Sequence, residues 1–384
     1  MNIEQYIIDC LRSVICGEDL SLPELDPEQQ KKVYKTAVRQ DLAHLVSYAM
    51  RKKGLPVEKE FSDQENLAVY RYTHQALALE EIGYLFGQEE IPYLPLKGSV
   101  LRGYYPEAWM RTSSDTDVLI QEKDFERAKK ILTEKARFRF ESGNLKDASF
   151  YRDECVHLEL HRNLVRDKVQ DVFLSEHVWE QVEWNGMHCT MPDELFYCFH
   201  IEHMLRHFET GGCGIRFFLD LWILNHRDGH DRVKREALLE QSGRKKFEET
   251  ARHLSEVWFG GQEHTELTRK MEHFLFRAGV YGTIENWALV QEVQCESKVK
   301  SVLGRLWLPY EHLCWSYPEL RGRKYLQPYY EGKRFLQMIL DGRWKRSVKE
   351  LTANWTVDVK KKEEMSRMLE ELGLKQDTRI RNEK

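Results

Sequence analysis

The chain has 384 residues, of which 41% are hydrophobic and 32% charged, and its formal net charge is −5 at pH 7. This length exceeds what one hydrophobic core usually spans, so we expect two or three domains. The slightly acidic balance argues against a general nucleic-acid binder and against binding to anionic membranes through charge. The eight cysteines form no CxxC pair, which favours free thiols in a reducing cytoplasm.

The N-terminal region, residues 1–88, has the pattern of helices. Its first twenty residues place acids among apolar positions and lack a basic start, so they predict an amphipathic helix and no secretory signal. Residues 66–88 repeat apolar side chains at intervals of three and four, as a helix with one buried face does. No window approaches 18 uncharged apolar residues, so we expect no membrane span and a cytoplasmic location.

The helical spacing of apolar residues gives way to short apolar and alternating segments near Ile91, and the helical spacing returns at Pro192. Between these points a helix is predicted at 124–135, and strands are predicted at 91–97, 115–120, 155–161 and 184–192. Pro192 is followed by two acids and is well placed to begin a helix. We therefore predict a mixed α+β fold with an N-terminal helical region at 1–88, an α/β unit with a mixed sheet of four or five strands at 89–191, and a helical domain at 192–384.

Lys97-Gly98-Ser99 follows a predicted strand and precedes a predicted helix. A glycine at such a turn lets the backbone approach a phosphate, while the following amides and the Ser99 hydroxyl can donate hydrogen bonds to its oxygens. Turns of this kind are common, so the motif alone indicates little.

Asp115-Thr116-Asp117 begins the predicted strand at 115–120. Residues two apart in a strand share a face, so both carboxylates point the same way and Thr116 points the other way. Two carboxylates so close repel each other unless a cation joins them. Mg²⁺ prefers oxygen ligands and would remove that repulsion. A solvated strand end is the alternative for an isolated Asp-x-Asp.

Glu159 lies in a third predicted strand whose alternation is clean. Val156, Leu158 and Leu160 share one face, and Glu159 lies on the other face between two histidines. A carboxylate in an otherwise buried strand needs a partner. If this strand pairs beside 115–120, Glu159 completes a set of three carboxylates, as two-metal nucleotidyl transfer requires.

The order Gly-Ser, Asp-x-Asp and later acid resembles the nucleotidyltransferase superfamily of DNA polymerase beta. More narrowly, LPLKGSVLRGYYPEAWMRTSSDTDVLI is similar to a bacterial family described as uncharacterised nucleotidyltransferases. The shared features are Lys97-Gly98, Tyr105-Pro106, Arg111, Glu159-Leu160-His161, Arg206-His207, Gly214, Arg216 and Asp220. The resemblance covers roughly 85–375, and Thr116 departs from it because the family usually has an aliphatic residue there.

This resemblance implies an enzyme that moves a nucleoside monophosphate from an NTP, with ATP as the expected donor, to an acceptor that the sequence does not name. It implies Mg²⁺ as the cofactor, with Mn²⁺ as an alternative. The implied catalytic and metal-binding residues are Asp115, Asp117 and Glu159. The implied nucleotide-binding residues are Lys97, Gly98, Ser99, Arg111, His203 and His207. No membrane partner and no general nucleic-acid partner is expected.

Two other functions remain open from the sequence. His200, His203 and His207 share one helix face and could form a zinc hydrolase site, although the segment lacks HExxH. A non-catalytic nucleotide-binding module on the same fold is the second alternative, and the presence of all three carboxylates argues against it. Arg216 and Asp220, four residues apart, predict an ion pair within one helix.

Overall fold

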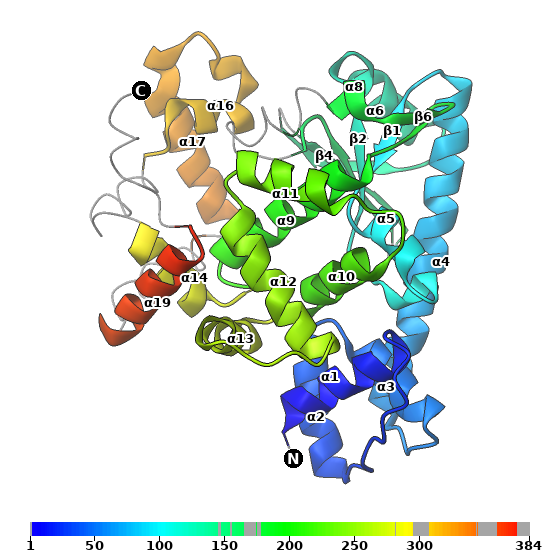
Figure 1. Ribbon diagram of the computed structural model, residues 1–384. Helices are drawn as coiled ribbons and strands as arrows, with labels where there is room; N and C mark the ends of the chain where they lie inside the picture. Colours follow the sequence, from blue (N-terminus) through cyan, green and yellow to red (C-terminus); the bar gives the residue numbers. More distant parts are fainter. Residues whose placement is uncertain are drawn as a thin grey trace. The chain divides into compact units, whose positions relative to one another are not determined.

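The structure, a computed structural model, describes residues 2–144, 147–153, 156–164, 174, 178–280, 282–294, 307–342, 344 and 359–374. Contacts divide the chain into two compact units. The first comprises Met1–His203, Ile215–Ser242 and Arg252–Glu263, and the second comprises Met204–Gly214, Gly243–Ala251 and His264–Lys384. Along the chain, helices precede and follow a mixed sheet (Figure 1), which confirms the predicted α+β class. None of the helices in the described ranges has the length and apolar surface to cross a membrane.

The first unit begins with four helices: α1 (Ile3–Val14), α2 (Pro27–Arg39), α3 (Ala43–Lys52) and α4 (Lys59–Gln88). Local sequence sets their starts. The Asn2 side chain accepts hydrogen bonds from two backbone N–H groups of α1, and Asp26 forms a capping box with Gln29 before α2. α1 packs against α2 and α3, and α3 packs against α4. The predicted helix at 66–88 is thus the larger part of α4.

The described residues form a seven-stranded sheet in the order β3-β4-β5-β2-β1-β7-β6. Its strands are β1 (Tyr93–Pro95), β2 (Thr116–Ile120), β3 (Arg139–Gly143), β4 (Asp147–Arg152), β5 (Val156–His161), β6 (Glu183–Asn185) and β7 (His188–Thr190). β2 pairs with β5, and β1 with β7, in parallel; the other pairs are antiparallel. All four predicted segments contain strands, and the last contains two. The β3–β4 hairpin was not predicted, because every residue of β3 is exposed and shows no apolar alternation.

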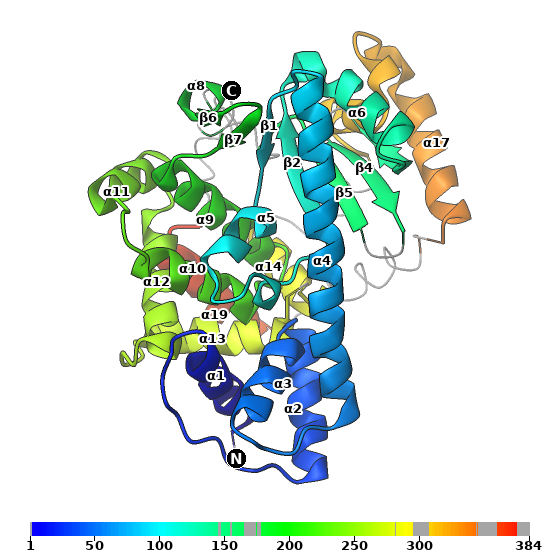
Figure 2. The same cartoon turned by 90° about the vertical axis from the view of Figure 1, so that its right-hand side faces the viewer.

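One face of the sheet carries the core of the first unit. α4 runs along the sheet, and α6 (Phe125–Glu134) lies beside it (Figure 2). The buried apolar residues of this core come from α4, α6 and alternate positions of the strands; they include Ala78, Ile82, Phe86, Val118, Ile120, Phe125, Ile131, Phe150, Leu158 and Leu160. Because strand side chains alternate between faces, the other face carries Asp117 of β2, Ser149 and Tyr151 of β4, and His157, Glu159 and His161 of β5.

The remaining helices of the first unit include α5 (Gly98–Leu101), α8 (Val178–Gln181), α10 (Ile215–His226) and α11 (Arg232–Gln241). α9 (Asp193–Glu209) begins directly after Pro192, as predicted, and it crosses the boundary between the units, as does α12 (Lys245–Phe259). The second unit contains α13 (Glu266–Ala278), α14 (Ile284–Gln294), α16 (Tyr310–Ser316), α17 (Gln327–Leu340) and α19 (Val359–Glu371). The cysteines in the described ranges are free thiols, and Cys155 and Cys295 lie outside those ranges.

Candidate functional site: a carboxylate cluster on the sheet

The parallel pairing of β2 with β5 brings the three predicted carboxylates together. Asp117 lies opposite Glu159 in the register of these strands. The alternate residues of both strands lie in the apolar core, so the carboxylates lie on the polar face. Ligand atoms of Asp115 and Glu159 lie within 4.8 Å of each other, and so do ligand atoms of Asp117 and Glu159. Strand alternation and register together therefore place all three at one point of the sheet.

Asp117 is buried, with 2% of its surface exposed, and two basic groups hold it. Lys97 Nζ donates to Asp117 Oδ1 at 2.6 Å, and His161 Nε2 lies 2.7 Å from the same oxygen. Burial alone would raise the pKa of Asp117, but the charge of Lys97 and the hydrogen bond from His161 outweigh burial and hold this pKa well below its usual range. Asp117 is consequently an anion at neutral pH.

Asp115 has the opposite electrostatic environment. Burial and the nearby charge of Asp117 raise the pKa of Asp115, and Glu159 adds to this effect. Lys97 opposes the rise. The cluster thus holds three carboxylates against one ammonium group, and the repulsion that remains favours the arrival of another cation.

The donor set suits a divalent ion. The described residues contain two groups of potential ligands, Asp115 with His157 and Glu159, and Asp117 with Glu159 and His161. The carboxylate oxygens suit Mg²⁺. The imidazoles add nitrogen donors, which transition metals accept more readily.

The Lys97-Gly98-Ser99 turn lies beside the cluster and joins β1 to α5. Lys97 has φ 49° and ψ −122°, a conformation that residues other than glycine rarely adopt. A side chain at Gly98 would place its Cβ 2.9 Å from Ser113 Cβ, so glycine is required here by close packing against the segment that leads into β2. Ser99 Oγ is buried and has no hydrogen-bond partner among the described residues. The described residues therefore leave the hydrogen-bonding capacity of this hydroxyl unused.

Comparison with known proteins gives the family of the chain. The model of a family described as uncharacterised nucleotidyltransferase matches residues 26–260. The chain belongs to this family. The match contains α2 to α4, the whole sheet and every residue of the carboxylate cluster, and it ends before α13, short of the limit near 375 expected from the sequence. Comparisons with curated proteins and with solved structures found no match. Membership of the family supports nucleotidyl transfer as the class of reaction.

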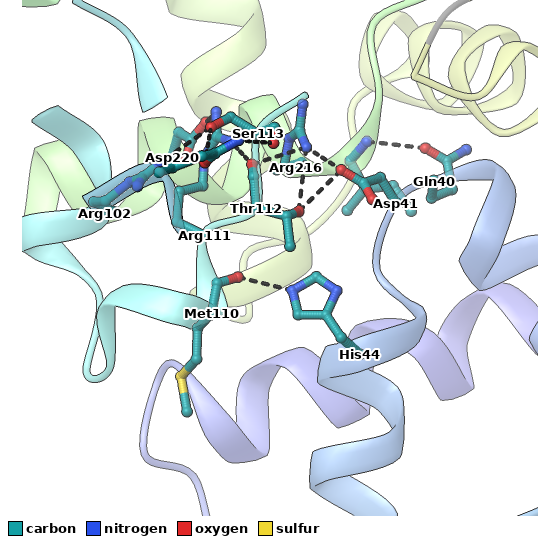
Figure 3. A network of polar contacts seen from close by, with 12 residues as sticks. Gln40, Asp41, His44, Arg102, Met110, Arg111, Thr112, Ser113, Arg216 and Asp220 are labelled. Atoms are coloured by element: carbon teal, nitrogen blue, oxygen red, sulfur yellow. Dashed lines mark hydrogen bonds and ion pairs between the residues drawn. The ribbon is translucent and has the colours of Figure 1, made fainter. Parts of the chain in front are cut away.

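Arg111 does not have the contacts expected of a phosphate ligand. It is 4% exposed and forms a bidentate ion pair with Asp220, which is fully buried. Arg111 Nε donates to Asp220 Oδ1 at 2.7 Å, and Nη2 donates to Oδ2 at 2.8 Å. Arg111 Nη1 donates to the carbonyl of Thr112. These contacts use every nitrogen of the guanidinium group, so Arg111 holds the segment before β2 (Figure 3).

Arg216 does not pair with Asp220 within α10 as the spacing predicted, because Asp220 already binds Arg111. Arg216 Nη1 instead contacts Asp41 Oδ2, and it donates to the carbonyl oxygen of Thr112 at 3.1 Å. Figure 3 shows these residues converging from the loop after α2, the segment before β2 and α10. This polar network fixes the chain three residues before Asp115.

The three histidines of α9 have separate surroundings. His200 is buried and lies 3.3 Å from the carbonyl oxygen of Phe217. The ring of His203 lies beside those of Phe199 and Phe217, and His207 belongs to the second unit. Within the described ranges, none of the three joins a group of metal-ligand side chains. The histidine face therefore gives no support to a zinc site, and the contact of His203 and His207 with nucleotide stays a prediction.

Sequence reasoning assigned no role to three polar residues at the cluster. His161 contacts Asp117, and His157 lies 2.7 Å, through Nε2, from Ser149 Oγ of β4. The ring of Tyr151, also in β4, stacks on His157 with centroids 4.4 Å apart. The alternation of β5 already placed both histidines on the face of Glu159. The contribution of β4 could not be foreseen because β4 itself was not predicted.

Proposed function

We propose that this chain is a Mg²⁺-dependent nucleotidyltransferase that transfers a nucleoside monophosphate from an NTP, with ATP as the donor, to an acceptor hydroxyl. The observation that carries the proposal is the cluster of three carboxylates on paired parallel strands, with Lys97 as its neutralising ammonium group. Such a cluster would hold a divalent ion, and that ion would neutralise the charge of the triphosphate. Mn²⁺ is the alternative ion, because the cluster also offers imidazole nitrogens.

Each residue of the cluster has a role in this proposal. Asp115 and Asp117 would hold the divalent ion, which supplies positive charge to the phosphates and to the attacking oxygen. Glu159 would be a further ligand or the base that takes the acceptor proton. Ser99 Oγ, buried and without a partner among the described residues, would donate to a phosphate oxygen at the Gly98 turn. Arg111 is given a positioning role because Asp220 binds its guanidinium group.

The chemical step balances as an ordinary displacement at phosphorus. The acceptor oxygen forms a bond to the α-phosphorus of the NTP, and the bond from that phosphorus to the oxygen bridging to the β-phosphate breaks. Pyrophosphate leaves with the electron pair, and the acceptor proton passes to Glu159 or to water.

Asp117→Asn tests this function. The variant keeps the size of the side chain but removes one charge from the site, so labelled ATP offered with Mg²⁺ and an extract freed of small molecules should label its acceptor on the order of 10²-fold more slowly than with wild type. Release of pyrophosphate should fall in parallel. Asp63→Asn, an exposed position on α4, is the matched control and should behave like wild type.

Mn²⁺ binding, followed by electron paramagnetic resonance, separates the enzyme from a binding module. The proposal requires that Asp117→Asn weaken Mn²⁺ binding as well as transfer. A wild-type protein that binds ATP without transferring it, and whose Asp117→Asn variant binds ATP and Mn²⁺ equally well, would leave the non-catalytic module as the function.

A further inference from the structure

A row of side chains leads from the carboxylate cluster to the edge of the sheet. His157 of β5 lies opposite Tyr151 of β4, and Tyr151 lies opposite Arg139 of β3. His157 has a ring nitrogen within 4.8 Å of ligand atoms of Asp115 and Glu159. The rings of Tyr151 and His157 are nearly parallel, with 7° between their planes. The polar face thus continues without a break from the cluster to β3.

The row ends in a hollow of about 580 Å³. Its lining residues are Glu81, Lys135, Arg137, Arg139, Tyr151, Arg152 and Asp153. Arg152 pairs with Glu81 at 2.5 Å, and Lys135 pairs with Glu89 at 2.5 Å. The side chains of Arg137 and Arg139 form no ion pair or hydrogen bond with any residue in the described ranges, and Asp153 is the remaining carboxylate of the lining. Two arginines therefore stay available to an anion, in a chain whose net charge is −5.

The hollow and the proposed phosphate turn lie on opposite sides of β2. Lys97, Gly98 and Ser99 follow β1, which flanks β2 on one side, while β5, β4 and β3 extend from its other side. If the phosphates of the NTP contact the turn, the NTP occupies the β1 side of the cluster. The β5 side then stays open for the second substrate. Glu159, the residue that would take the acceptor proton, lies on this side, in β5.

We propose that the acceptor is an anionic molecule whose phosphate or carboxylate group binds Arg137 and Arg139 while its hydroxyl lies at Glu159. Guanidinium groups donate paired N–H bonds that match the oxygens of both anions. β3 lies two strands from β5 at ~4.8 Å per strand, and Arg139 is in register with His157, which is two residues, or about 6.6 Å, along β5 from Glu159. The anionic group and the attacking oxygen are therefore separated by about 12 Å. This assignment of the substrate class rests on the proposed transferase function and uses the same displacement, with pyrophosphate leaving.

The first test measures anion binding directly and needs no turnover. Inorganic phosphate and acetate are titrated separately into wild-type protein, with and without Mg²⁺ and a non-hydrolysable ATP analogue, and binding is followed by calorimetry. Arg137→Gln/Arg139→Gln should weaken phosphate or acetate binding tenfold or more, and the stronger ligand identifies the anion. Arg71→Gln/Lys130→Gln, which removes the same charge from exposed positions outside the hollow, should bind as wild type does. Equal binding by wild type and Arg137→Gln/Arg139→Gln overturns the site.

The second test asks whether the acceptor is anionic. An extract is passed over anion-exchange resin, and both fractions are labelled with ATP and Mg²⁺. The acceptor should be in the retained fraction, and Arg137→Gln/Arg139→Gln should label it tenfold more slowly while binding the ATP analogue normally. An acceptor found only in the unretained fraction, or labelled equally by both proteins, overturns the proposal. If wild type labels neither fraction and releases no pyrophosphate, the transferase function fails, and the phosphate titration still decides the anion site.

Discussion

Lys97 occupies the position from which a cation can balance Asp117. Burial lowers the pKa of Lys97, but the adjacent charges of Asp117 and Asp115 raise it more, so its pKa lies above the usual range. The ammonium group is therefore charged at neutral pH. In the proposed reaction the divalent ion competes with Lys97 for Asp117, because both are cations. The NTP phosphates compete with Asp117 for Lys97, because both are anions.

Lys97→Met should consequently change the affinities for metal and for nucleotide in opposite directions. Without the ammonium group the cluster is more negative, so Mn²⁺ binding in the absence of nucleotide should tighten on the order of tenfold, equivalent to about 1.4 kcal/mol. The apparent KM for NTP should rise, because phosphate binding contributes to ground and transition states alike. Lys130→Met, an exposed position on α6, is the control. Weaker Mn²⁺ binding by Lys97→Met would show that the lysine supports the cluster instead of competing for it.

Among single residues, the shared face of the three carboxylates was predictable from the sequence, whereas the contacts of their neighbours were not. Alternation along β2 and β5 is a local property, so the shared face of Asp115, Asp117 and Glu159 follows from spacing alone. The ion-pair partner of Asp220 does not follow from spacing. Arg216 is four residues away and Arg111 is 109 away, and only the packing of α10 against the segment before β2 selects the distant arginine. Thr116 is buried, and its Oγ1 has no partner within the described ranges.

Between elements, the polar network around Arg111 and Asp220 links α10, the segment before β2 and the N-terminal helices. Gln40 Oε1 accepts a hydrogen bond from the N–H of Ile215 at 3.1 Å, and His44 Nε2 lies 2.9 Å from the carbonyl oxygen of Met110. All of these groups lie in the first unit. Because β2 starts just beyond this network, the placement of Asp115 depends on contacts made by α10 and α3.

Asp220→Asn and Arg111→Met should each destabilise the protein by about 3–5 kcal/mol, because each leaves a buried partner uncompensated. Arg111→Met/Asp220→Asn should recover part of the loss, since both charges are removed. Chemical denaturation of the three variants gives the coupling energy. Arg232→Gln breaks an exposed pair within α11 and should cost less than about 1 kcal/mol. If the double variant loses as much free energy of unfolding as the two single variants lose together, direct coupling is refuted.

The elements themselves were predictable where a side-chain period was present. The helices of residues 1–88 and the strand β5 have apolar positions at regular intervals, whereas β1 and β2 belong to short apolar runs, and the structure contains all of these elements. β3 lacked that signal, because it has no buried residue. A bulge also interrupts its pairing with β4 between Phe140 and Ser142. The proposed acceptor site is therefore on the part of the sheet that the sequence did not predict.

On the scale of the molecule, two buried histidines make stability depend on pH. Burial lowers the pKa of His44 and of His200, whereas an unfolded histidine titrates near pH 6.5. Below about pH 6.5 the unfolded chain binds protons that the folded chain does not, so the free energy of unfolding falls as pH falls. The melting temperature should therefore drop between pH 7.5 and 5.5.

His44→Gln keeps a side-chain donor near the carbonyl oxygen of Met110 and cannot be protonated. Its melting temperature should fall less than that of wild type over the same pH range. The melting temperature of His44→Gln/His200→Gln should fall by a still smaller amount. His74→Gln, which replaces a half-buried histidine of α4, is the control and should retain the wild-type slope. Equal slopes for wild type and the double variant would mean that neither imidazole governs acid stability.

The limits of the compact units could not be predicted from the sequence. The sequence divides into three consecutive regions by period, whereas contacts join Ile215–Ser242 and Arg252–Glu263 to the unit that contains the sheet. Period describes local conformation only, and it carries no information on which distant helix a segment packs against. The three predicted regions therefore stay a proposal about chain organisation.

β3 is a terminal strand of the sheet, so one of its sides has no neighbouring strand among the residues that the structure describes. Unpaired edges can template association with other chains, and charged side chains and bulges are the usual protection against it. β3 has both, with Arg139 and Glu141 on the strand and the irregularity between Phe140 and Ser142. Removing the charge of Arg139 to test acceptor binding also removes part of this protection against aggregation. Protein concentration therefore becomes an experimental variable, and glutamine is a safer replacement for this arginine than any apolar residue.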